Sequence, residues 1–353
     1  MKKKKTEKGV SLAEIAREAD VSRMAVSLAL RNQPRVSAKT RERILKIAKK
    51  LGYAPDARLA SWMTAVRDTR TRDLMPIAWL NSSTEEAAWR THSYLTPYRE
   101  GAEKRCTHLG YRLEEFWLRK AGMTSARLSK ILYSRGIHGV ILAPPHDGLG
   151  MGRVKLDWQH FACAAFEEKV LLAPQIHRVA QDWFYNTTLV LKILRRLGYR
   201  RIGVYLGGQV ERRSSHASRA AVNYFHLRIP GAERVPLMIN KEPAVRFDQL
   251  SAWMKRVKPD VVVGQQSELV EAVRAAGYRV PEQVGVVHTA LEDDCADWAG
   301  VWARKREIGA MAADIVIARL QKNDFGLPYV RSNTLIPGQW HSGKTLLEPK
   351  PRM

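Results

Sequence analysis

Residues 10–55, VSLAEIAREADVSRMAVSLALRNQPRVSAKTRERILKIAKKLGYAP, contain three short amphipathic segments with almost no linker between them. Ser11 followed by Glu14 is a capping-box pair, which predicts a helix from residue 11 to about residue 19. Ser22 is a second N-cap candidate only a few residues further on. Because so short a turn cannot bring two helices antiparallel, the first two helices are expected to cross steeply.

The next two segments have the apolar spacing of helices. The stripe of the second helix consists of Met24, Val26 and Leu30. A third helix is expected after Ser37, with an apolar face made of Ile44, Leu45, Ala48 and Leu51. Gly52 is placed to end it in a left-handed conformation. The pattern predicts a helix-turn-helix with a supporting third helix.

The high positive charge of this region indicates a negatively charged partner. Residues 1–72 hold 19 Lys plus Arg against 7 Asp plus Glu, a net of +12 that is half of the whole chain's +24. Such a density on a helix-turn-helix suits the neutralisation of phosphates. A three-helix bundle that merely docks on the rest of the protein remains the alternative at this point.

The segments LAEIAREADVS, AVSLALRN and VSAKTRERILKIAKKLGY, followed by Pro55, resemble without a gap the DNA-binding headpiece of the LacI/GalR family of bacterial transcription regulators. Two departures stand out. Leu28 occupies a position where the family commonly has arginine, and Asp20 replaces the glycine of the turn. The first departure leaves the base preference open.

This resemblance implies a homodimer that binds a near-palindromic double-stranded DNA operator, with the second helix in the major groove. The candidate DNA-binding residues are Ser11, Ser22, Arg23, Met24, Ser27, Asn32, Lys39, Arg41, Tyr53, Trp62 and Met63.

Residues 56–73, DARLASWMTAVRDTRTRD, join the headpiece to the rest of the chain. Leu59, Met63 and Val66 lie at helical spacing, and a polar tether follows them. The resemblance implies a hinge helix that inserts an apolar wedge into the minor groove. Counting from the Gly-Tyr-x-Pro element places the wedge at Trp62, with Met63 as the adjacent alternative. Packing of Trp62 against the body is the other explanation.

Beyond residue 75 the body alternates strand and helix patterns, which predicts parallel sheets covered on both faces. The strand runs are MPIAWLN, RLEEFWL, HGVILAPP, RIGVYLGG, PDVVVGQQ and VGVVHT. LGYR at residues 109–112 and 197–200 and AGYR at 276–279 each place a glycine where a helix ends.

The chain is expected to divide into five parts: a basic tail at 1–9, the headpiece at 10–55, the hinge at 56–73, a two-lobed domain at 74–340 and a C-terminal tail at 341–353.

The stretches RGIHGVILAPP, VAQDWFYNTTLVLKILRRLGYRRIGVYLGG, AGYRVPEQVGVV and EIGAMAADIVIARL resemble the family's regulatory part, a pair of α/β lobes like those of periplasmic sugar-binding proteins. A ligand of that fold binds in the crevice at the carboxyl ends of the strands. The candidate effector-binding residues are Asn81, Ser83, His146, Asp147, Asp182, Arg219, Gln266 and His288.

Arg219 is expected just before the helix AAVNYF and aligns best with the arginine by which the family fixes a sugar hydroxyl or purine group, although a surface arginine is as plausible in so basic a chain. The family's usual pocket aspartate is missing, because His288, Thr289 and Ala290 stand there. Four tryptophans are candidates for stacking on a sugar face or for the core, Trp79, Trp89, Trp183 and Trp253.

Other classes of protein are disfavoured. The sequence has no Gly-x-Ser-x-Gly and no His-Glu-x-x-His pattern, and its three cysteines lack metal spacing, so neither an enzyme nor a metal or other cofactor is expected. The lysine run at residues 2–5 lacks the apolar stretch of a signal peptide, and no apolar run approaches the ~18 residues of a membrane helix.

The sequence is therefore expected to encode a cytoplasmic regulator, a repressor controlled by a sugar-like effector. The rivals are a solute-binding receptor without a DNA role and a nucleoid-type binder without an effector. The C-terminal tail lacks a leucine heptad, so nothing in it suggests a tetramer.

Overall fold

The computed structural model describes residues 12–30, 36–52, 74–144, 154–166, 175–242, 244–291 and 293–347. The chain divides into two compact units with a boundary between Leu74 and Met75, and residues Ile317–Phe325 are assigned to the first unit. The headpiece and the body are therefore described separately. The predicted tail at 1–9 and hinge at 56–73 lie outside the described residues.

The headpiece consists of three helices, as predicted: α1 (Leu12–Glu18), α2 (Arg23–Leu30) and α3 (Ala38–Lys50). The Ser22 Oγ accepts a hydrogen bond from the Ala25 backbone N–H at 3.1 Å, and the Ser37 Oγ accepts one from the Thr40 N–H at 3.3 Å. Both serines thus satisfy amides at a helix start. The helices share a small core made of Ile15, Ala16, Ala19, Val26, Ala29, Val36, Ile44 and Ala48.

The predicted apolar faces of α2 and α3 were wrong at one residue each. Met24 is 72% exposed and Leu45 is 45% exposed. The reason is helical geometry, because Val26 and Ala29 define the inner face of α2, and Ile44 and Ala48 that of α3.

The turns contain two left-handed residues. Gly52 has φ +71°, as expected for the residue that ends the third helix. Asp20, in the turn between α1 and α2, has φ +49°. The turn therefore keeps a conformation that glycine adopts most easily, although an aspartate stands there.

The first half of the body is built on a parallel sheet with the strand order β11-β5-β4-β3-β1-β2. Its strands are β1 (Met75–Asn81), β2 (Tyr111–Trp117), β3 (Gly139–Leu142), β4 (Ala162–Phe166), β5 (His177–Gln181) and β11 (Asn333–Ile336). The helices of this lobe are α5 (Ala88–Thr91), α6 (Thr96–His108) and α7 (Ser125–Ser134), with the 3-10 turns η1 (Ser93–Leu95) and η3 (Trp158–His160). The predicted parallel pairing is confirmed for every neighbour in this sheet.

The second sheet has the order β12-β10-β9-β8-β6-β7, in which only the edge strand β12 pairs antiparallel among the described residues. Its strands are β6 (Ile202–Gly207), β7 (Met238–Asn240), β8 (Val261–Gly264), β9 (Gly285–Leu291), β10 (Ala299–Trp302) and β12 (Gln339–His341). The helices of this lobe are α8 (Trp183–Arg196), α9 (Gly208–Arg213), α10 (Ala217–His226), α11 (Phe247–Val257) and α12 (Leu269–Ala275), with the turns η4 (Gly231–Glu233) and η5 (Asp293–Cys295). The helix α13 (Lys305–Lys322) returns to the first lobe, where it packs against α6.

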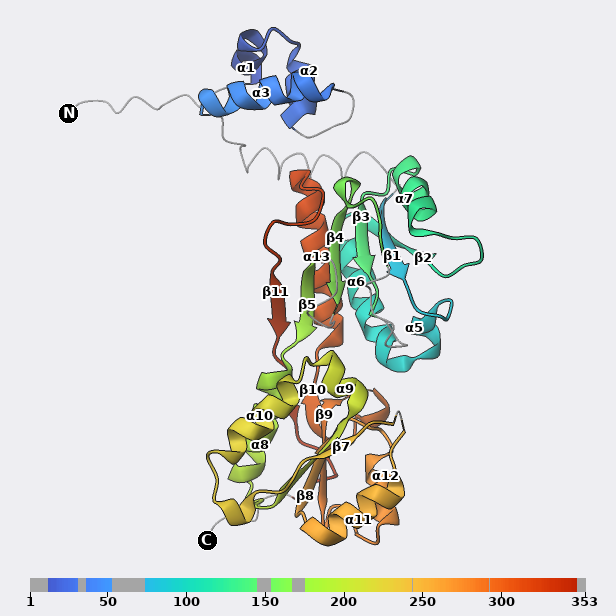
Figure 1. The fold of residues 1–353 in the computed structure, drawn as a ribbon, viewed down its shortest axis with the longest axis vertical. Helices are drawn as coiled ribbons and strands as arrows, with labels where there is room; N and C mark the ends of the chain where they lie inside the picture. Colours follow the sequence, from blue (N-terminus) through green and yellow to red (C-terminus); the bar gives the residue numbers. More distant parts are fainter. Residues whose placement is uncertain are drawn as a thin grey trace, which may run out of the picture. The chain divides into compact units, whose positions relative to one another are not determined.

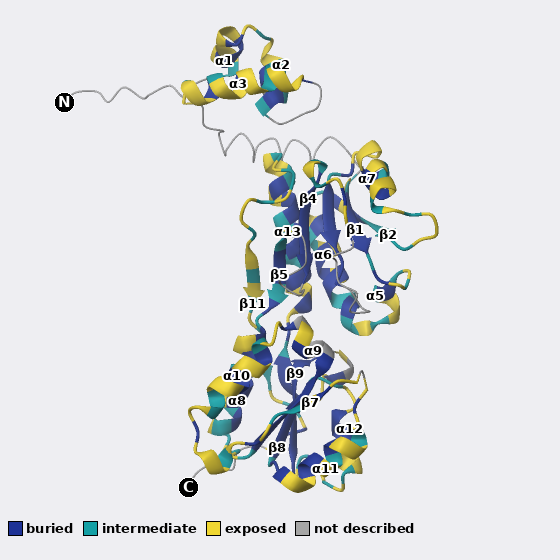
Figure 2. Cartoon of the chain, viewed as in Figure 1, coloured by how far each residue is buried: buried dark blue, intermediate teal, exposed yellow. Residues whose placement is uncertain are grey.

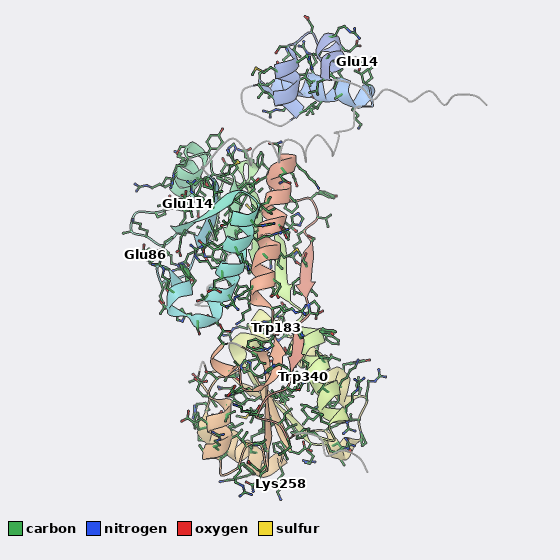
Figure 3. The ribbon with its side chains drawn as sticks, turned by 180° about the vertical axis from the view of Figure 1, so that it is seen from behind. Glu14, Glu86, Glu114, Trp183, Lys258 and Trp340 are labelled. Atoms are coloured by element: carbon green, nitrogen blue, oxygen red, sulfur yellow. The ribbon has the colours of Figure 1, made fainter. Side chains whose placement is uncertain are left out.

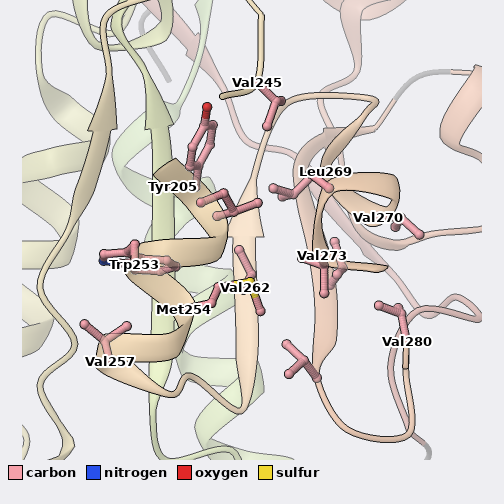
Figure 4. Close-up of a cluster of buried hydrophobic side chains, with 14 of the residues drawn as sticks. Tyr205, Val245, Trp253, Met254, Val257, Val262, Leu269, Val270, Val273 and Val280 are labelled. Atoms are coloured by element: carbon pink, nitrogen blue, oxygen red, sulfur yellow. The ribbon is translucent and has the colours of Figure 1, made fainter. Parts of the chain in front are cut away.

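Alternate residues of each strand face opposite helical layers. In the second sheet Val262 packs with α11 and α12, whereas Val261 and Val263 pack with α8 and α10. Figure 4 shows the first of these clusters, in which Trp253 and Met254 lie beside the sheet. The inner strands of both sheets are buried, whereas the edge strands β11 and β12 are exposed or half-buried, as are the outer faces of the covering helices (Figure 2).

The chain passes between the two sheets three times, from β5 to α8, from β10 to α13 and from β11 to β12 (Figure 1). The body therefore consists of two α/β lobes with parallel-dominated sheets, as predicted. The glycines of the LGYR and AGYR repeats, Gly110, Gly198 and Gly277, all have positive φ, which confirms their predicted place at helix ends.

Candidate functional site

The exposed start of α2 is the candidate DNA-reading surface. Arg23 and Met24 are exposed there, while Val26 and Ala29 point into the headpiece core. Ser22 is exposed too, and its hydroxyl is used as the cap of the helix. The surface is thus presented by a helix whose opposite face is fixed by packing.

Basic side chains on α3 extend the positive surface of the headpiece. Lys39 is exposed and Arg41 is half-buried, both in the first turns of the helix. Ser11, Asn32, Tyr53, Trp62 and Met63 lie outside the described residues, as does the side chain of Ser27. Their predicted contacts with DNA stay predictions.

In the first lobe, Asn81 and Ser83 are buried just after β1 and are tied into the loop that follows it. The Asn81 Nδ2 donates to the Glu85 carbonyl oxygen at 2.8 Å, and its Oδ1 accepts from the Ser83 N–H at 2.9 Å. The Ser83 carbonyl oxygen accepts from the Trp117 Nε1 at 3.0 Å. These groups therefore build the loop at the carboxyl end of the strand. His146 and Asp147 lie outside the described residues.

In the second lobe, the predicted residues follow different elements. Asp182 precedes α8 and caps it, since its Oδ1 accepts from the Tyr185 N–H at 2.8 Å. Gln266 follows β8 and is half-buried. His288 is buried in β9, where its Nδ1 accepts from the Ala290 N–H at 3.2 Å and its ring lies edge-on to Trp298 at 6.0 Å.

Arg219 differs from the expectation in one respect. It was expected to precede its helix, but α10 begins at Ala217, so the arginine lies in the first turn and is exposed. The connection before it holds Ser215 and His216 at φ +50° and +65°.

Three of the four tryptophans are buried, Trp79, Trp183 and Trp253. Trp79 of β1 is buried against Phe166, and Trp253 of α11 belongs to the cluster of Figure 4. Trp183 begins α8, next to the crossover from β5, and Trp340 lies in β12 (Figure 3). Trp89 is half-buried, with the Arg99 guanidinium 4.5 Å from its ring centre and its Nε1 donating to the Glu115 Oε2 at 2.8 Å.

A pocket of about 360 Å³ lies where segments of both lobes meet. It is lined by Ser93, Pro97, Leu291, Asp293, Trp302, Arg304, Lys305, Arg306, Glu307 and Gln339. None of the eight predicted effector residues is in this set. One signal in the sequence points to it, namely the consecutive bases Arg304–Arg306 before the EIGAMAADIVIARL segment.

Residues 338–345, GQWHSGKT, match the Gly-x-x-x-x-Gly-Lys-Thr pattern of a phosphate-binding loop. The structure gives this stretch another role. The Thr345 hydroxyl donates to the Val286 carbonyl oxygen at 2.6 Å and accepts from the Ala299 N–H at 2.9 Å, and Lys344 pairs with Asp297 at 2.7 Å. The stretch contains β12, and residues 344–345 form a turn where such a loop requires the start of a helix. It is not a phosphate-binding loop.

Among the described residues there is no group of three or more His, Cys, Asp and Glu side chains placed to hold a metal ion. In the same part of the chain, no helix combines the length and apolar character needed to cross a membrane.

Residues 11–56 match the family described as bacterial regulatory proteins, lacI family. No curated protein matches the sequence. The fold is similar to the lac repressor dimer bound to operator and the anti-inducer ONPF, with 19% identity, a TM-score of 0.57 and coverage of 96% of this chain and 100% of that one.

Two further solved structures share the fold. The transcriptional regulator CelR in its cellobiose complex has 20% identity, a TM-score of 0.55 and coverage of 95% and 99%. A LacI family transcriptional regulator from Enterococcus faecium with bound ribose has 15% identity, a TM-score of 0.54 and coverage of 78% and 99%. The predicted resemblance is confirmed, by family over the headpiece and by fold over the body.

Proposed function

Residues 11–56 belong to the lacI family of bacterial regulatory proteins, and on that premise we propose that the chain is a sequence-specific transcription regulator controlled by a small molecule. The observation that carries the proposal is the joining of this headpiece to a two-lobed α/β body. A solute-binding receptor without a DNA role would not need the headpiece. We therefore prefer the regulator to that rival.

The mechanism follows from the two parts. The start of α2, with Arg23 and Met24 exposed, reads base edges in the major groove, while Lys39 and Arg41 hold phosphates. Two copies bind a near-palindromic operator as a homodimer, and the hinge deforms the minor groove. A repressor with a sugar-like effector is the specific form that we propose, and the sugar ligands named for CelR and the E. faecium protein support it.

Control by the effector requires that it bind two lobe arrangements unequally. The three crossovers are the segments across which the lobes move relative to one another, and the pocket of about 360 Å³ lies beside the crossover between β10 and α13. A ligand in this pocket touches both lobes. Its binding energy is thereby coupled to their arrangement.

The test starts with the full chain and a random duplex library, from which bound DNA is selected and sequenced. We expect a two-fold symmetric motif, protected in a footprint as two half-sites, with affinity that falls steeply as salt rises. A panel of mono- and oligosaccharides, sugar acids and purines is then added to the footprint. Absence of any enriched motif would refute the regulator. A nucleoid-type binder would show uniform affinity for all sequences and no response to any ligand.

A further inference from the structure

The segment between β1 and α6 forms part of the wall of the pocket. We call its residues 84–95 the lid; they contain α5 and η1 (Figure 1). Ser93 of the lid lines the pocket of about 360 Å³. Ala87, the residue before α5, has φ +51°, a left-handed conformation that residues other than glycine seldom adopt. The position of the lid therefore depends on the contacts that hold it against the lobe.

Trp89 of α5 makes two of these contacts through its ring. The Arg99 guanidinium of α6 lies 4.5 Å from the ring centre, and the Trp89 Nε1 donates to the Glu115 Oε2 of β2 at 2.8 Å. The Trp89 carbonyl oxygen also accepts from the Thr96 Oγ1 at 2.6 Å. The indole thus joins the lid to both α6 and β2, and Trp89 acts as the latch of the lid.

Arg99 is incompletely satisfied in this arrangement. The residue is only 8% exposed, and its Nε and Nη1 are buried without a hydrogen-bond partner among the residues that the structure describes. Its ion pair with Glu103 is long, at 3.9 Å. Burying a cation costs free energy unless it is paired and hydrogen-bonded. The face of the Trp89 ring compensates this cost only in part, through a cation–π interaction.

Glu115 is incompletely satisfied as well. Its Oε2 accepts from Trp89, whereas its Oε1 is buried and has no hydrogen-bond partner in the described part of the chain. An ionised carboxylate has room for several hydrogen bonds on its two oxygens. Arg99 therefore has spare donors and Glu115 a spare acceptor, and each could satisfy the other.

The two charged residues lie within reach of one another. Glu115 is the direct partner of Trp79 in the parallel ladder of β1 and β2, so both side chains leave the same face of the sheet, on strands about 4.8 Å apart. The Arg99 guanidinium lies 5.9 Å from the ring centre of Trp79. A rotation of the arginine side chain is thus enough to bring its planar group to the carboxylate.

We infer that the lid has two arrangements, in which the Trp89 latch and a direct ion pair between Arg99 and Glu115 replace one another. When Trp89 leaves, the guanidinium donates to both Glu115 oxygens, and charge-assisted pairs of this geometry are strong. The ion pair offsets the contacts that the lobe loses, so the two arrangements differ little in free energy. A ligand that touches the lid shifts such a balance. The inference rests on the proposed function, because it supplies a means of regulation for the pocket assigned to the effector.

Hydrogen–deuterium exchange of the full chain, read by mass spectrometry without ligand or DNA, tests the inference. Trp89→Ala should raise the exchange rates of the lid amides about 10-fold, because the latch is lost. The rates in β2 and in α6 should stay within about 3-fold of those of the original chain, because the new ion pair replaces the latch there.

The second variant removes the replacement. Glu115→Gln alone should change the rates in the lid, β2 and α6 by less than about 3-fold, since a glutamine oxygen still accepts from Trp89. In the double variant Trp89→Ala/Glu115→Gln, Arg99 has neither partner. The rates in β2 and α6 should then rise about 10-fold above those of either single variant.

Glu114→Gln in the Trp89→Ala background is the matched control. Glu114 is the neighbour of Glu115 in β2 and pairs with Arg135 at 2.8 Å, on the other face of the sheet. This control should leave β2 and α6 as they are in Trp89→Ala alone. Should Trp89→Ala fold poorly, Trp89→Phe keeps a ring over Arg99 but removes the N–H donor, and it should show the same pattern with a smaller increase.

Three results would overturn the inference. The first is a lid whose exchange is unchanged in Trp89→Ala. The second is a rise in β2 and α6 already in that single variant, which would mean that no ion pair replaces the latch. The third is equal exchange of Trp89→Ala with and without Glu115→Gln. Each of them would leave the proposed regulator intact, because selection of an operator by the full chain is measured separately.

Discussion

The Asn186 side chain of α8 accepts a hydrogen bond through its Oδ1 from the Gly338 backbone N–H, at 2.8 Å. Asn186 is buried in the first turns after one crossover, and Gly338 lies in another. Asn186→Leu should leave the Gly338 N–H without its partner, which costs about 1–3 kcal/mol of unfolding free energy. Urea denaturation followed by circular dichroism measures the change. Asn223→Leu, on the exposed face of α10, should change it by less than about 0.5 kcal/mol, and equal effects of both variants would contradict a structural role of the bond.

Arg23→Ala should lower affinity for the selected operator by about 1–3 kcal/mol and relax the base preference at one position, because arginine reads base edges by paired hydrogen bonds. Lys39→Ala should weaken cognate and random duplexes alike, since phosphates carry no sequence information. Fluorescence anisotropy on both duplexes separates the two effects. An equal loss on both duplexes for Arg23→Ala would refute its assignment to base reading.

Trp62→Gly should reduce operator affinity and DNA bending together while ligand affinity stays unchanged. An apolar wedge unstacks a base step at a cost of a few kcal/mol, which is recovered through the contacts that bending permits. Gel mobility of duplexes with the site at different positions measures the bend, and Met63→Gly shows whether the adjacent residue is the wedge instead. If bending is unchanged and only thermal stability falls, Trp62 packs the hinge and does not enter DNA.

If Arg219 holds the effector, as the family resemblance implies, Arg219→Ala should abolish the ligand's effect on operator affinity while sparing DNA binding in the absence of ligand, because a ligand shifts DNA affinity only through unequal binding to two lobe arrangements. Calorimetry of the variant followed by operator titration is the measurement. If the variant keeps both full ligand affinity and the full effect of the ligand on operator affinity, this exposed arginine takes no part in ligand binding. The binding site would then be sought among the residues that line the pocket of about 360 Å³.

The body should lose stability as the pH falls through 6.5, in part through His226. Burial lowers the pKa of His226 below its ordinary value of 6.5, and the positive charge of Arg234 lowers it further. Between the lowered pKa and 6.5 the unfolded chain binds a proton that the folded chain does not, so stability falls as pH falls through that window. His226→Gln should flatten the pH dependence of the urea midpoint, and His108→Gln, an exposed histidine of α6, should not. Identical profiles for both variants would show that His226 contributes nothing.

The sequence by itself determined the local elements of this protein. Ser22 and Ser37 cap helices as their positions predict, and the glycines of the LGYR repeats end helices in left-handed conformations. The run MPIAWLN is strand β1, residue for residue. These features depend on hydrogen bonds within a few residues and on φ preferences, which neighbouring residues set. The pattern of the headpiece was specific enough to identify its family.

Only the tertiary structure decided which strands are neighbours and which side chains meet. The alternation of apolar residues shows that a face is buried, but not what covers it, so Met24 and Leu45 were placed in apolar stripes although both side chains are exposed. β11 joins the sheet of β5 although more than 150 residues separate them, and β12 turns antiparallel beside β10. The pocket combines residues 93, 291, 304 and 339 for the same reason. Contacts between residues so far apart in the sequence form only when the two lobes fold and pack. Short-range sequence patterns carry no information about that packing.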